Sequence, residues 1–206
     1  TPNGSGTYTV TYSVTDNNGD FARDEVIVTV ENTAPVLDTF VSDADSLTTK
    51  SDDNTVSVSG TFSDFGLGSH TVLIDWGDGT TPTEANVDQA SDAFEATHDY
   101  DTGGIFTITA TVVDASGLTS NMEATTGIVT GVGLVDGTLY VIGTDGKDKV
   151  GVKVDRWNDK LYVDAKLDLQ HHHHHWWHGH HHGHTSDRIR MTFTASEVQK
   201  VVAFLC

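Results

Sequence analysis

Cysteine is nearly absent from this sequence of 206 residues, because its one thiol belongs to Cys206, the last residue. A single cysteine excludes an internal disulfide. It leaves an extracellular location open, since many large bacterial surface modules do without disulfides. Long apolar runs are also missing, and none approaches the roughly 18 residues that a membrane helix needs. We therefore expect no membrane insertion by this segment.

Basic residues are the second scarce class, with 11 Lys and Arg against 30 Asp and Glu, which gives a formal net charge of −19. A surface this acidic repels nucleic acid and anionic lipid, because phosphate contacts need Lys and Arg. It suits a protein that meets water, salt and divalent cations. We therefore expect no nucleic-acid partner.

A signal peptide and an initiator Met are likewise missing from the sequence. It begins with TPNGSGTYTV and stops on the apolar run VVAFLC. We interpret it as an internal segment of a longer polypeptide, whose targeting signals would lie elsewhere.

Long stretches of Leu, Ala, Glu and Lys, which favour helices, are absent, and Thr, Ser, Asp, Gly and Val dominate instead. This mixture favours strands and turns. We therefore predict an all-β protein. With 206 residues the chain has one or two domains and can bury a sizeable core.

Two stretches that lie 98 residues apart resemble each other: GTYTVTYSVTDNNG at 6–19 and GIFTITATVVDASG at 104–117. Each alternates apolar and hydroxyl residues and closes on an Asp-x-x-Gly turn, which is typical of a strand with one buried face. Another alternating run follows each turn, so each copy predicts an antiparallel hairpin. The identical pairs are Gly6/Gly104, Thr9/Thr107, Thr11/Thr109, Val14/Val112, Asp16/Asp114 and Gly19/Gly117.

The spacing of the two copies matches an immunoglobulin-like β-sandwich, which has about 100 residues. We predict a complete sandwich over 36–128, whereas 1–33 holds only the C-terminal hairpin of a truncated module of the same class. Pro35 lies in the joint between them and blocks continuation of the preceding ladder. Earlier strands of the complete sandwich are predicted at 54–64, 70–80 and 92–100.

The second copy carries a series of motifs: DWGDGT, then HDY, then the stretch from Gly104 to Gly117. This series resembles the polycystic-kidney-disease (PKD) type of immunoglobulin-like domain. That family has a W-G-D-G turn, an aromatic ending such as H-x-Y, and a strand of the form G-x-Y/F-x-V-x-L-x-V-x-D-x-x-G. The residues that lie on this pattern are Trp76, Gly77, Asp78, Gly79, His98, Tyr100, Gly104, Asp114 and Gly117.

The PKD resemblance implies extracellular tandem modules, which act as spacers or bind protein or carbohydrate at a cell surface or in a matrix. It implies no catalysis by the module itself.

The residues of the W-G-D-G region have mainly structural readings. We expect Trp76 in the core between the sheets, and Gly77 and Gly79 in a turn with positive φ. The lone His70 and His98 are expected to be satisfied structural groups. A Ca²⁺ site is the alternative for this region, because hard cations need several oxygen ligands. Its candidate ligands are Asp75, Asp78 and Asp99.

The sequence pattern changes after the Gly-rich segment TTGIVTGVG, which we interpret as a linker to a β-rich module over 134–206. Within it, GTDGKDKVG at 143–151 resembles one nonapeptide of the hemolysin-type (RTX-like) calcium repeats. That resemblance implies Ca²⁺ at Asp145 and Asp148, although each such ion needs two adjacent repeats and only one is present. An Asp-Gly hairpin turn explains the spacing equally well.

Further strands are predicted in this module at 159–169 and 188–195. The run at 197–205 favours a strand over a short helix. We expect a small β-sheet or the start of a β-solenoid.

The stretch HHHHHWWHGHHHGH at 171–184 contains ten His residues. A purification tag would lie at a terminus, so we interpret the stretch as a native loop between two predicted strands. Neutral imidazole suits Zn²⁺, Cu²⁺ and Ni²⁺, and i, i+2 pairs can converge on one ion. The candidate ligands are His171, His173, His175, His178, His180, His182 and His184.

Two other roles stay open for the His-rich loop: a tolerated low-complexity insertion, which could be adhesive through Trp176 and Trp177, and a charge change below about pH 6. Catalysis is disfavoured, because no HExxH spacing or paired carboxylate accompanies the imidazoles.

The leading hypothesis is therefore a non-catalytic segment of a large secreted or cell-surface bacterial protein, with sandwich modules that serve as spacers or in adhesion. The alternatives are a surface metal-sequestering protein and an accessory segment of a secreted hydrolase. No organic cofactor is expected.

Overall fold

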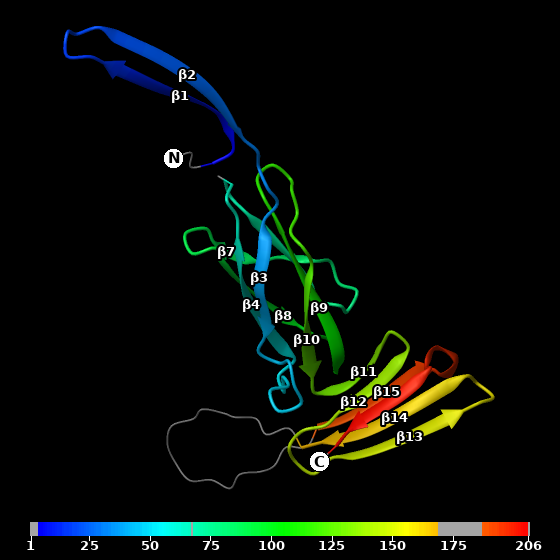
Figure 1. Cartoon of the computed structure of the whole chain (residues 1–206). Coiled ribbons are helices and arrows are strands. Elements are labelled where there is room, and N and C mark those ends of the chain that lie inside the picture. Colours follow the sequence, from blue (N-terminus) through cyan, green and yellow to red (C-terminus); the bar gives the residue numbers. More distant parts are fainter. Residues whose placement is uncertain (1–3, 67, 169–186, 206) are drawn as a thin grey trace, which may run out of the picture.

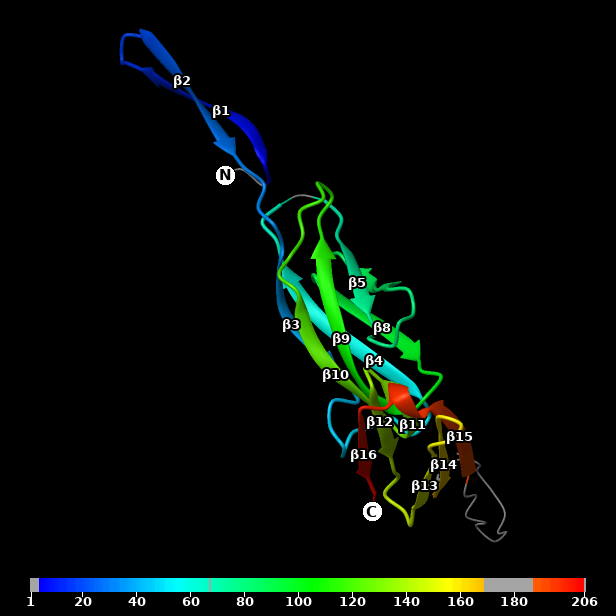
Figure 2. The ribbon, with the colours of Figure 1, turned by 90° about the vertical axis from the view of Figure 1, so that its right-hand side faces the viewer.

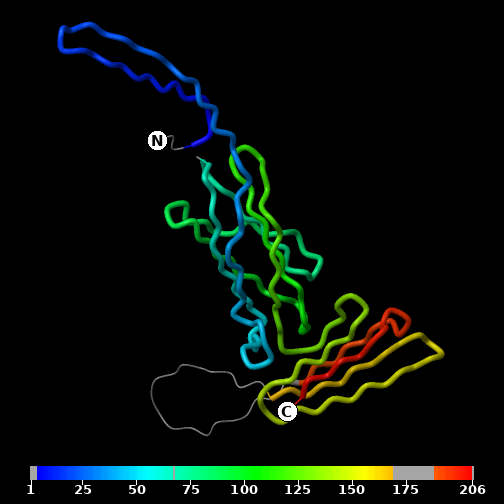
Figure 3. The backbone as a smooth tube through the Cα atoms, viewed as in Figure 1, coloured from blue at the N-terminus to red at the C-terminus, as the bar shows by residue number. Residues whose placement is uncertain are grey.

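The computed structural model describes residues 4–66, 68–168 and 187–205, and in these the regular structure is strands apart from one short 3₁₀ helix. The all-β prediction is confirmed. Figures 1 and 2 show three units that follow one another from one end of the molecule to the other: a hairpin, a sandwich and a C-terminal module. The tube in Figure 3 traces the chain through them in this order.

The N-terminal hairpin consists of β1 (Gly6–Thr15) and β2 (Phe21–Val30), which pair antiparallel along their whole length. Strand β1 covers the same positions of the repeat as β9 (Gly104–Val113) does 98 residues later. One prediction is wrong here, because the alternating face of β1 is exposed, including Val10, Tyr12 and Val14. Among the described residues, no sheet faces the hairpin in the way that a sheet covers the equivalent residues of β9.

The sandwich has two four-stranded sheets with antiparallel neighbours. One has the order β3-β4-β8-β7 and the other the order β10-β9-β5-β6. The first sheet contains β3 (Val36–Ser42), β4 (Thr55–Ser63), β7 (Asn86–Asp88) and β8 (Ala93–Asp99). The second contains β5 (Thr71–Asp75), β6 (Thr83–Glu84), β9 and β10 (Glu123–Val129).

The inner faces of the two sheets share one hydrophobic core, because alternate residues of each strand point between them. Strand β9 shows the alternation most clearly, since every second residue from Gly104 to Val112 is buried. The core side chains from the first sheet include Leu37, Val56, Val58, Phe62 and Phe94, and those from the second include Val72, Ile74, Phe106, Ile108, Ala110 and Val112.

The C-terminal module contains two three-stranded sheets around a second, smaller core. One sheet has β11 (Gly131–Val135), β12 (Thr138–Ile142) and β16 (Lys200–Phe204), and its β12 and β16 run parallel. The other has β13 (Lys149–Asp155), β14 (Lys160–Leu167) and β15 (Asp187–Thr194), all antiparallel. The 3₁₀ helix Ala195–Glu197 precedes β16. The buried side chains are Val132, Leu139, Val141, Leu161, Val163, Ala165 and Leu167.

Three details of this region differ from or refine the expectations. The Gly-rich segment predicted as a linker is strand on both sides of Thr130, in β10 and β11. Of the two architectures expected for the module, the small sheet is found, because three of its four strand pairings are antiparallel and only that of β12 with β16 is parallel, unlike the parallel stacking of a solenoid. The run at 197–205 forms strand β16, as the sequence favours.

Among the described residues, no helix combines the length and the hydropathy that a bilayer crossing requires.

The repeat provides a matched test of the sandwich core. Val112 is 0% exposed and Val14, its equivalent in the hairpin, is 64% exposed. Val112→Ala removes buried methyl groups and leaves a cavity, so we expect it to lower the free energy of unfolding by about 2 kcal/mol. Val14→Ala removes the same atoms from an exposed site and should cost less than about 0.5 kcal/mol. Urea unfolding followed by circular dichroism measures both, and equal costs would contradict the assigned core.

Candidate functional site

The W-G-D-G motif closes one end of the sandwich around Trp76, which directly follows β5 and is fully buried. The Trp76 indole Nε1 donates a hydrogen bond to Thr83 Oγ1 at 3.0 Å. Its backbone carbonyl accepts a hydrogen bond from the Tyr100 hydroxyl at 2.8 Å. Both the indole and the backbone of Trp76 are therefore anchored, and the strand end cannot shift without breaking a buried hydrogen bond.

His98 and Tyr100 form an aromatic group with Trp76. The His98 ring stacks on Trp76 with centroids 4.9 Å apart and an interplanar angle of 15°. The Tyr100 ring meets His98 edge-on at 4.7 Å and stacks on Phe106 at 4.1 Å. His98 Nε2 lies 2.8 Å from Asp78 Oδ2. The H-x-Y ending of β8 thus folds over the turn that follows β5.

Glycine is required in this turn for two reasons. Gly77 has φ +73°, and a Cβ there would lie 2.3 Å from the Thr107 carbonyl oxygen. Gly79 has φ +82°, which L side chains rarely adopt. The turn therefore approaches the β9 backbone too closely for any other residue at position 77.

The polar groups of the turn stabilise one another. Burial alone would raise the pKa of Asp78, but hydrogen bonds from the Thr80 hydroxyl and amide and from His98 outweigh it and lower that pKa. Burial raises the pKa of the Tyr100 phenol, and the carboxylates of Asp78 and Asp75 raise it further. Tyr100 therefore stays neutral and donates its hydrogen bond.

The carboxylates proposed as an alternative Ca²⁺ site do not converge on one point. Asp75 accepts a hydrogen bond from the Gly77 amide, Asp78 is held by Thr80 and His98, and Asp99 accepts one from the Thr55 hydroxyl. In the described part of the chain no three His, Cys, Asp or Glu residues form a group that could hold a metal ion. Each carboxylate thus has a local hydrogen-bond partner, and calcium binding in this region stays a prediction.

The Asp114 turn at the other end of the sandwich repeats in the hairpin. The Asp114 carboxylate accepts hydrogen bonds from the amides of Ser116 and Leu118, both at 2.9 Å. Asp16 accepts the equivalent bonds from the amides of Asn18 and Asp20, at 2.8 and 2.9 Å. Gly117 and Gly19, which complete the turns, share φ +89°. The repeat seen in the sequence is therefore a repeat of geometry.

The Asp114 turn also receives the linker from the preceding hairpin. Asn32 Nδ2 donates to Asp114 Oδ2 at 2.6 Å and to Ser116 Oγ at 2.9 Å. These contacts join residues more than 80 positions apart, and they fix where the hairpin leaves the sandwich. Local pattern reasoning missed Asn32, because only the fold brings it to the turn.

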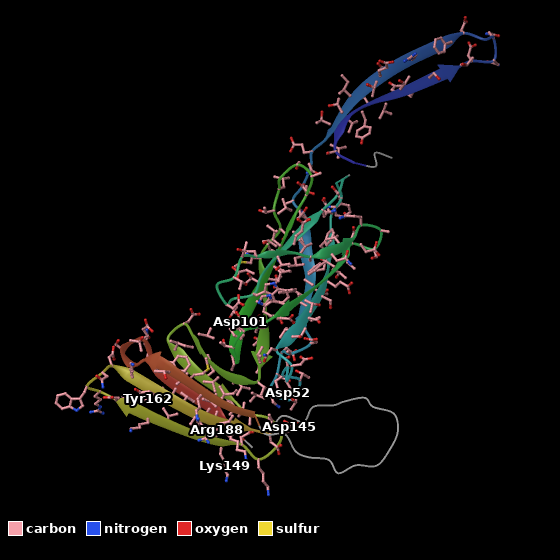
Figure 4. The ribbon with its side chains drawn as sticks, turned by 180° about the vertical axis from the view of Figure 1, so that it is seen from behind. Asp52, Asp101, Asp145, Lys149, Tyr162 and Arg188 are labelled. Carbon is pink, nitrogen blue, oxygen red and sulfur yellow. The ribbon has the colours of Figure 1, made fainter. Side chains whose placement is uncertain are left out.

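The joint between the sandwich and the C-terminal module is built from the segment before β4. The Ser51 amide donates to the Ile128 carbonyl at 2.9 Å, and the Thr130 amide donates to the Ser51 carbonyl at 2.8 Å. The Thr130 hydroxyl donates to Asp52 Oδ1. Lys50, whose side chain is only 6% exposed, donates to Asp145 Oδ1 at 2.7 Å and to the Leu47 carbonyl at 3.2 Å. Figure 4 labels Asp52 and Asp145 at this joint.

Backbone also packs on backbone at this joint. A Cβ on Gly103 would lie 2.4 Å from the Gly131 backbone, and one on Gly133 would lie 2.1 Å from the Gly103 carbonyl oxygen. The loop that precedes β9 therefore lies directly on β11.

The RTX-like stretch forms a closed loop between β12 and β13. Asp148 accepts hydrogen bonds from the Thr144 amide, the Thr144 hydroxyl and the Asp168 amide, at 2.9, 3.0 and 3.2 Å. Asp145, by contrast, turns toward Lys50 of the sandwich. The two carboxylates are engaged in different contacts and do not fit a shared Ca²⁺ as they stand, so calcium binding here stays a prediction. The seven candidate His ligands at 171–184 lie outside the described residues.

A buried contact between a histidine and a carboxylate lies at the end of the sandwich near the hairpin. The sequence predicts His70 as a satisfied structural group but does not identify its partner Asp64. His70 Nε2 lies 2.8 Å from Asp64 Oδ2, and both side chains are buried. The ring packs on Phe62, with centroids 4.8 Å apart. His70 Nδ1 is buried without a hydrogen-bond partner in the described part of the chain, so this ring is only half satisfied. Asp64 and His70 are six residues apart, a spacing with no recognised motif.

Solved structures similar to this chain include two of immunoglobulin-like class. The PKD1 domain of Vibrio anguillarum Epp is 26% identical, with a TM-score of 0.34, over 49% of this chain and 99% of that domain. The FN1–FN3 domains of chicken CNTN1 are 10% identical, with a TM-score of 0.32, over 89% of this chain and 63% of that one. No protein-family model and no curated protein matches the sequence. The sandwich assignment rests on the strand order and core of this chain.

The lowered pKa of Asp78 predicts a pH dependence of stability. Because folding lowers this pKa below its ordinary 3.8, the ionised carboxylate stabilises the fold fully above about pH 4, and the contribution is lost as the pH falls through the folded pKa. We expect Asp78→Asn to lower the free energy of unfolding by about 1–2 kcal/mol at pH 7, since a charge-assisted hydrogen bond is lost.

Urea unfolding between pH 2.5 and 7 measures this effect, and the difference between Asp78→Asn and the parent chain should shrink toward pH 2.5. Glu84→Gln is the control, because it neutralises an exposed carboxylate on the neighbouring β6. A deficit for Asp78→Asn that stays constant over the whole range would contradict the assigned role.

Proposed function

We propose that this chain is a non-catalytic segment of a secreted or cell-surface protein, in which PKD-type sandwich modules act as a spacer that presents the C-terminal β module. The observation that carries the proposal is the turn that recurs in the hairpin and the sandwich, together with the linker amide that docks on it. A chain that repeats one module and fixes its joint is suited to hold two points apart.

The motif residues support this reading. Trp76, His98 and Tyr100 are packed and hydrogen-bonded to their own turn, so these polar side chains serve the fold. The equal length of β1 and β9 and the matching Asp16 and Asp114 turns support a tandem arrangement.

The two joints support a spacer with defined orientation. Interfaces between domains of one chain are commonly small and allow relative motion. Here Asn32 binds the Asp114 turn at one joint. At the other, backbone hydrogen bonds through Ser51 and the buried Lys50 tie the modules together. Joints of this kind would hold neighbouring modules in one relative orientation.

The partner that this spacer would hold is a protein or a carbohydrate at a cell surface or in a matrix. The PKD resemblance of residues 76–117 supports this class.

Pulsed electron paramagnetic resonance tests the spacer. Spin labels on Thr97→Cys and Thr192→Cys, both exposed, report the distance between the sandwich and the C-terminal module in a Cys206→Ser background. We expect one narrow distance distribution. Lys50→Met should broaden it, because the buried stem stays while the ion pair and the hydrogen bond to Leu47 are lost.

Lys160→Met is the control, since it removes an exposed charge away from the joint and should leave the distribution narrow. A broad distribution in the parent chain would overturn the proposal of a fixed spacer.

A further inference from the structure

The sheet β13-β14-β15 has a solvent-facing side on which cations line up across the strands. The register places Lys149 opposite Lys166, and Lys166 opposite Arg188, so the three form one row across the sheet. All three side chains are exposed. Neighbouring strands lie roughly 4.8 Å apart, so this row is a closely spaced line of positive charge. Figure 4 labels Lys149 and Arg188 on it.

The basic face continues along the strands beyond that row. Asp164 forms an ion pair with Arg188, and Arg190 Nε lies 3.5 Å from the same carboxylate. Asp155 is held by the Asn158 side chain and two backbone amides. Positive charge is therefore in excess on this face. Its cations are Lys149, Lys153, Lys160, Lys166, Arg188 and Arg190.

The basic face stands out because charge is divided unevenly along the chain. Residues 1–133 contain 21 acidic and two basic residues, which accounts for the whole net charge of −19. Residues 134–206 contain nine of each. Repulsion of anionic partners is therefore expected of the hairpin and the sandwich, and not of the C-terminal module.

Aromatic rings lie beside these cations. Trp157, in the turn between β13 and β14, is 97% exposed, and Tyr162 on β14 is also exposed. Both line a shallow open groove together with Lys153, Val154, Asp155 and Arg156. A Trp side chain is rarely this exposed, and Trp and Tyr are enriched where proteins contact their partners.

We propose that the basic face and the Trp157 groove together bind an acidic polysaccharide, one that carries carboxylate or sulfate groups along a linear chain. Rows of Lys and Arg across the sheet match repeated negative charge, and the rings of Trp157 and Tyr162 match the apolar faces of sugar rings. This inference rests on the proposed non-catalytic surface function and names its partner class.

The acidic sandwich favours this occupant over a second copy of the chain. Two copies, each with 19 negative charges in excess, repel each other as they approach. A polysaccharide meets only the basic face, because charges on the sandwich are screened beyond a Debye length of about 8 Å at physiological salt.

Binding to immobilised polygalacturonate, dextran sulfate and neutral dextran tests the inference with the full chain. We expect binding to both acidic polymers, weakening as salt rises, and none to dextran. The double variant Lys149→Gln/Lys166→Gln should weaken binding about tenfold and flatten the salt dependence. Trp157→Ala should weaken binding to polygalacturonate while leaving the salt dependence unchanged.

The matched control is Arg23→Gln/Lys200→Gln, which removes two exposed cations from the hairpin and from β16. Its binding should equal that of the parent chain. Circular dichroism shows whether each variant is folded, and all these positions are exposed, so the fold should be kept.

Several outcomes would overturn the inference. One is equal loss in the control and the Lys149→Gln/Lys166→Gln variant, which would mean unspecific attraction. Another is tighter binding to single-stranded oligothymidylate than to either polymer, which would assign the face to nucleic acid. A third is salt-sensitive self-association that the double lysine variant abolishes, which would assign it to a second copy. Shortening of the bound polygalacturonate would instead contradict the proposed non-catalytic function and leave the binding face in place.

Discussion

The burial of one face of each sheet against the other is the interaction on which the sandwich depends. Val56 and Val58 on one sheet and Ile108 and Val112 on the other are almost wholly removed from water, and burial of this kind is the dominant favourable term in folding. The W-G-D-G turn packs on that core, because Trp76 extends the core to the end of the sheets. His98 and Tyr100 then cover the turn. The motif thus lies at the edge of the core, and the packing of its aromatic rings fixes the positions of its polar groups.

Much of this architecture could be predicted from residues that are neighbours in the chain. Alternation along β9 identified a half-buried strand, and Asp16 and Asp114 with their glycines identified the turns, because both signals arise within a few residues. The same alternation misled in β1, where Val10 and Tyr12 are exposed. Alternation reports only that one face is apolar, and whether a sheet covers that face depends on residues elsewhere.

The contacts that join the modules could not be predicted in this way. Lys50 and Asp145 are 95 residues apart, and Asn32 and Asp114 are 82 apart, so no local pattern links them. The glycines around Thr130 indicated a linker, yet they are strand residues. Glycine is needed there for another reason, because Gly131 and Gly133 make room for the backbone of Gly103. The basic face was hidden by the total charge, since 19 excess acids on the hairpin and sandwich outweigh a sheet whose own charge is opposite.

The packing of Gly103 on Gly131 and Gly133 has a consequence for how such chains evolve. Where two peptide backbones touch, no side chain can be introduced on either without moving the domains apart. Recombination that exchanged the C-terminal module for an unrelated one would preserve the angle between the domains only if a glycine of suitable conformation came with it. The relative placement of the sandwich and its neighbour is therefore encoded on both sides of the joint at once, in Gly103 and in Gly131 and Gly133.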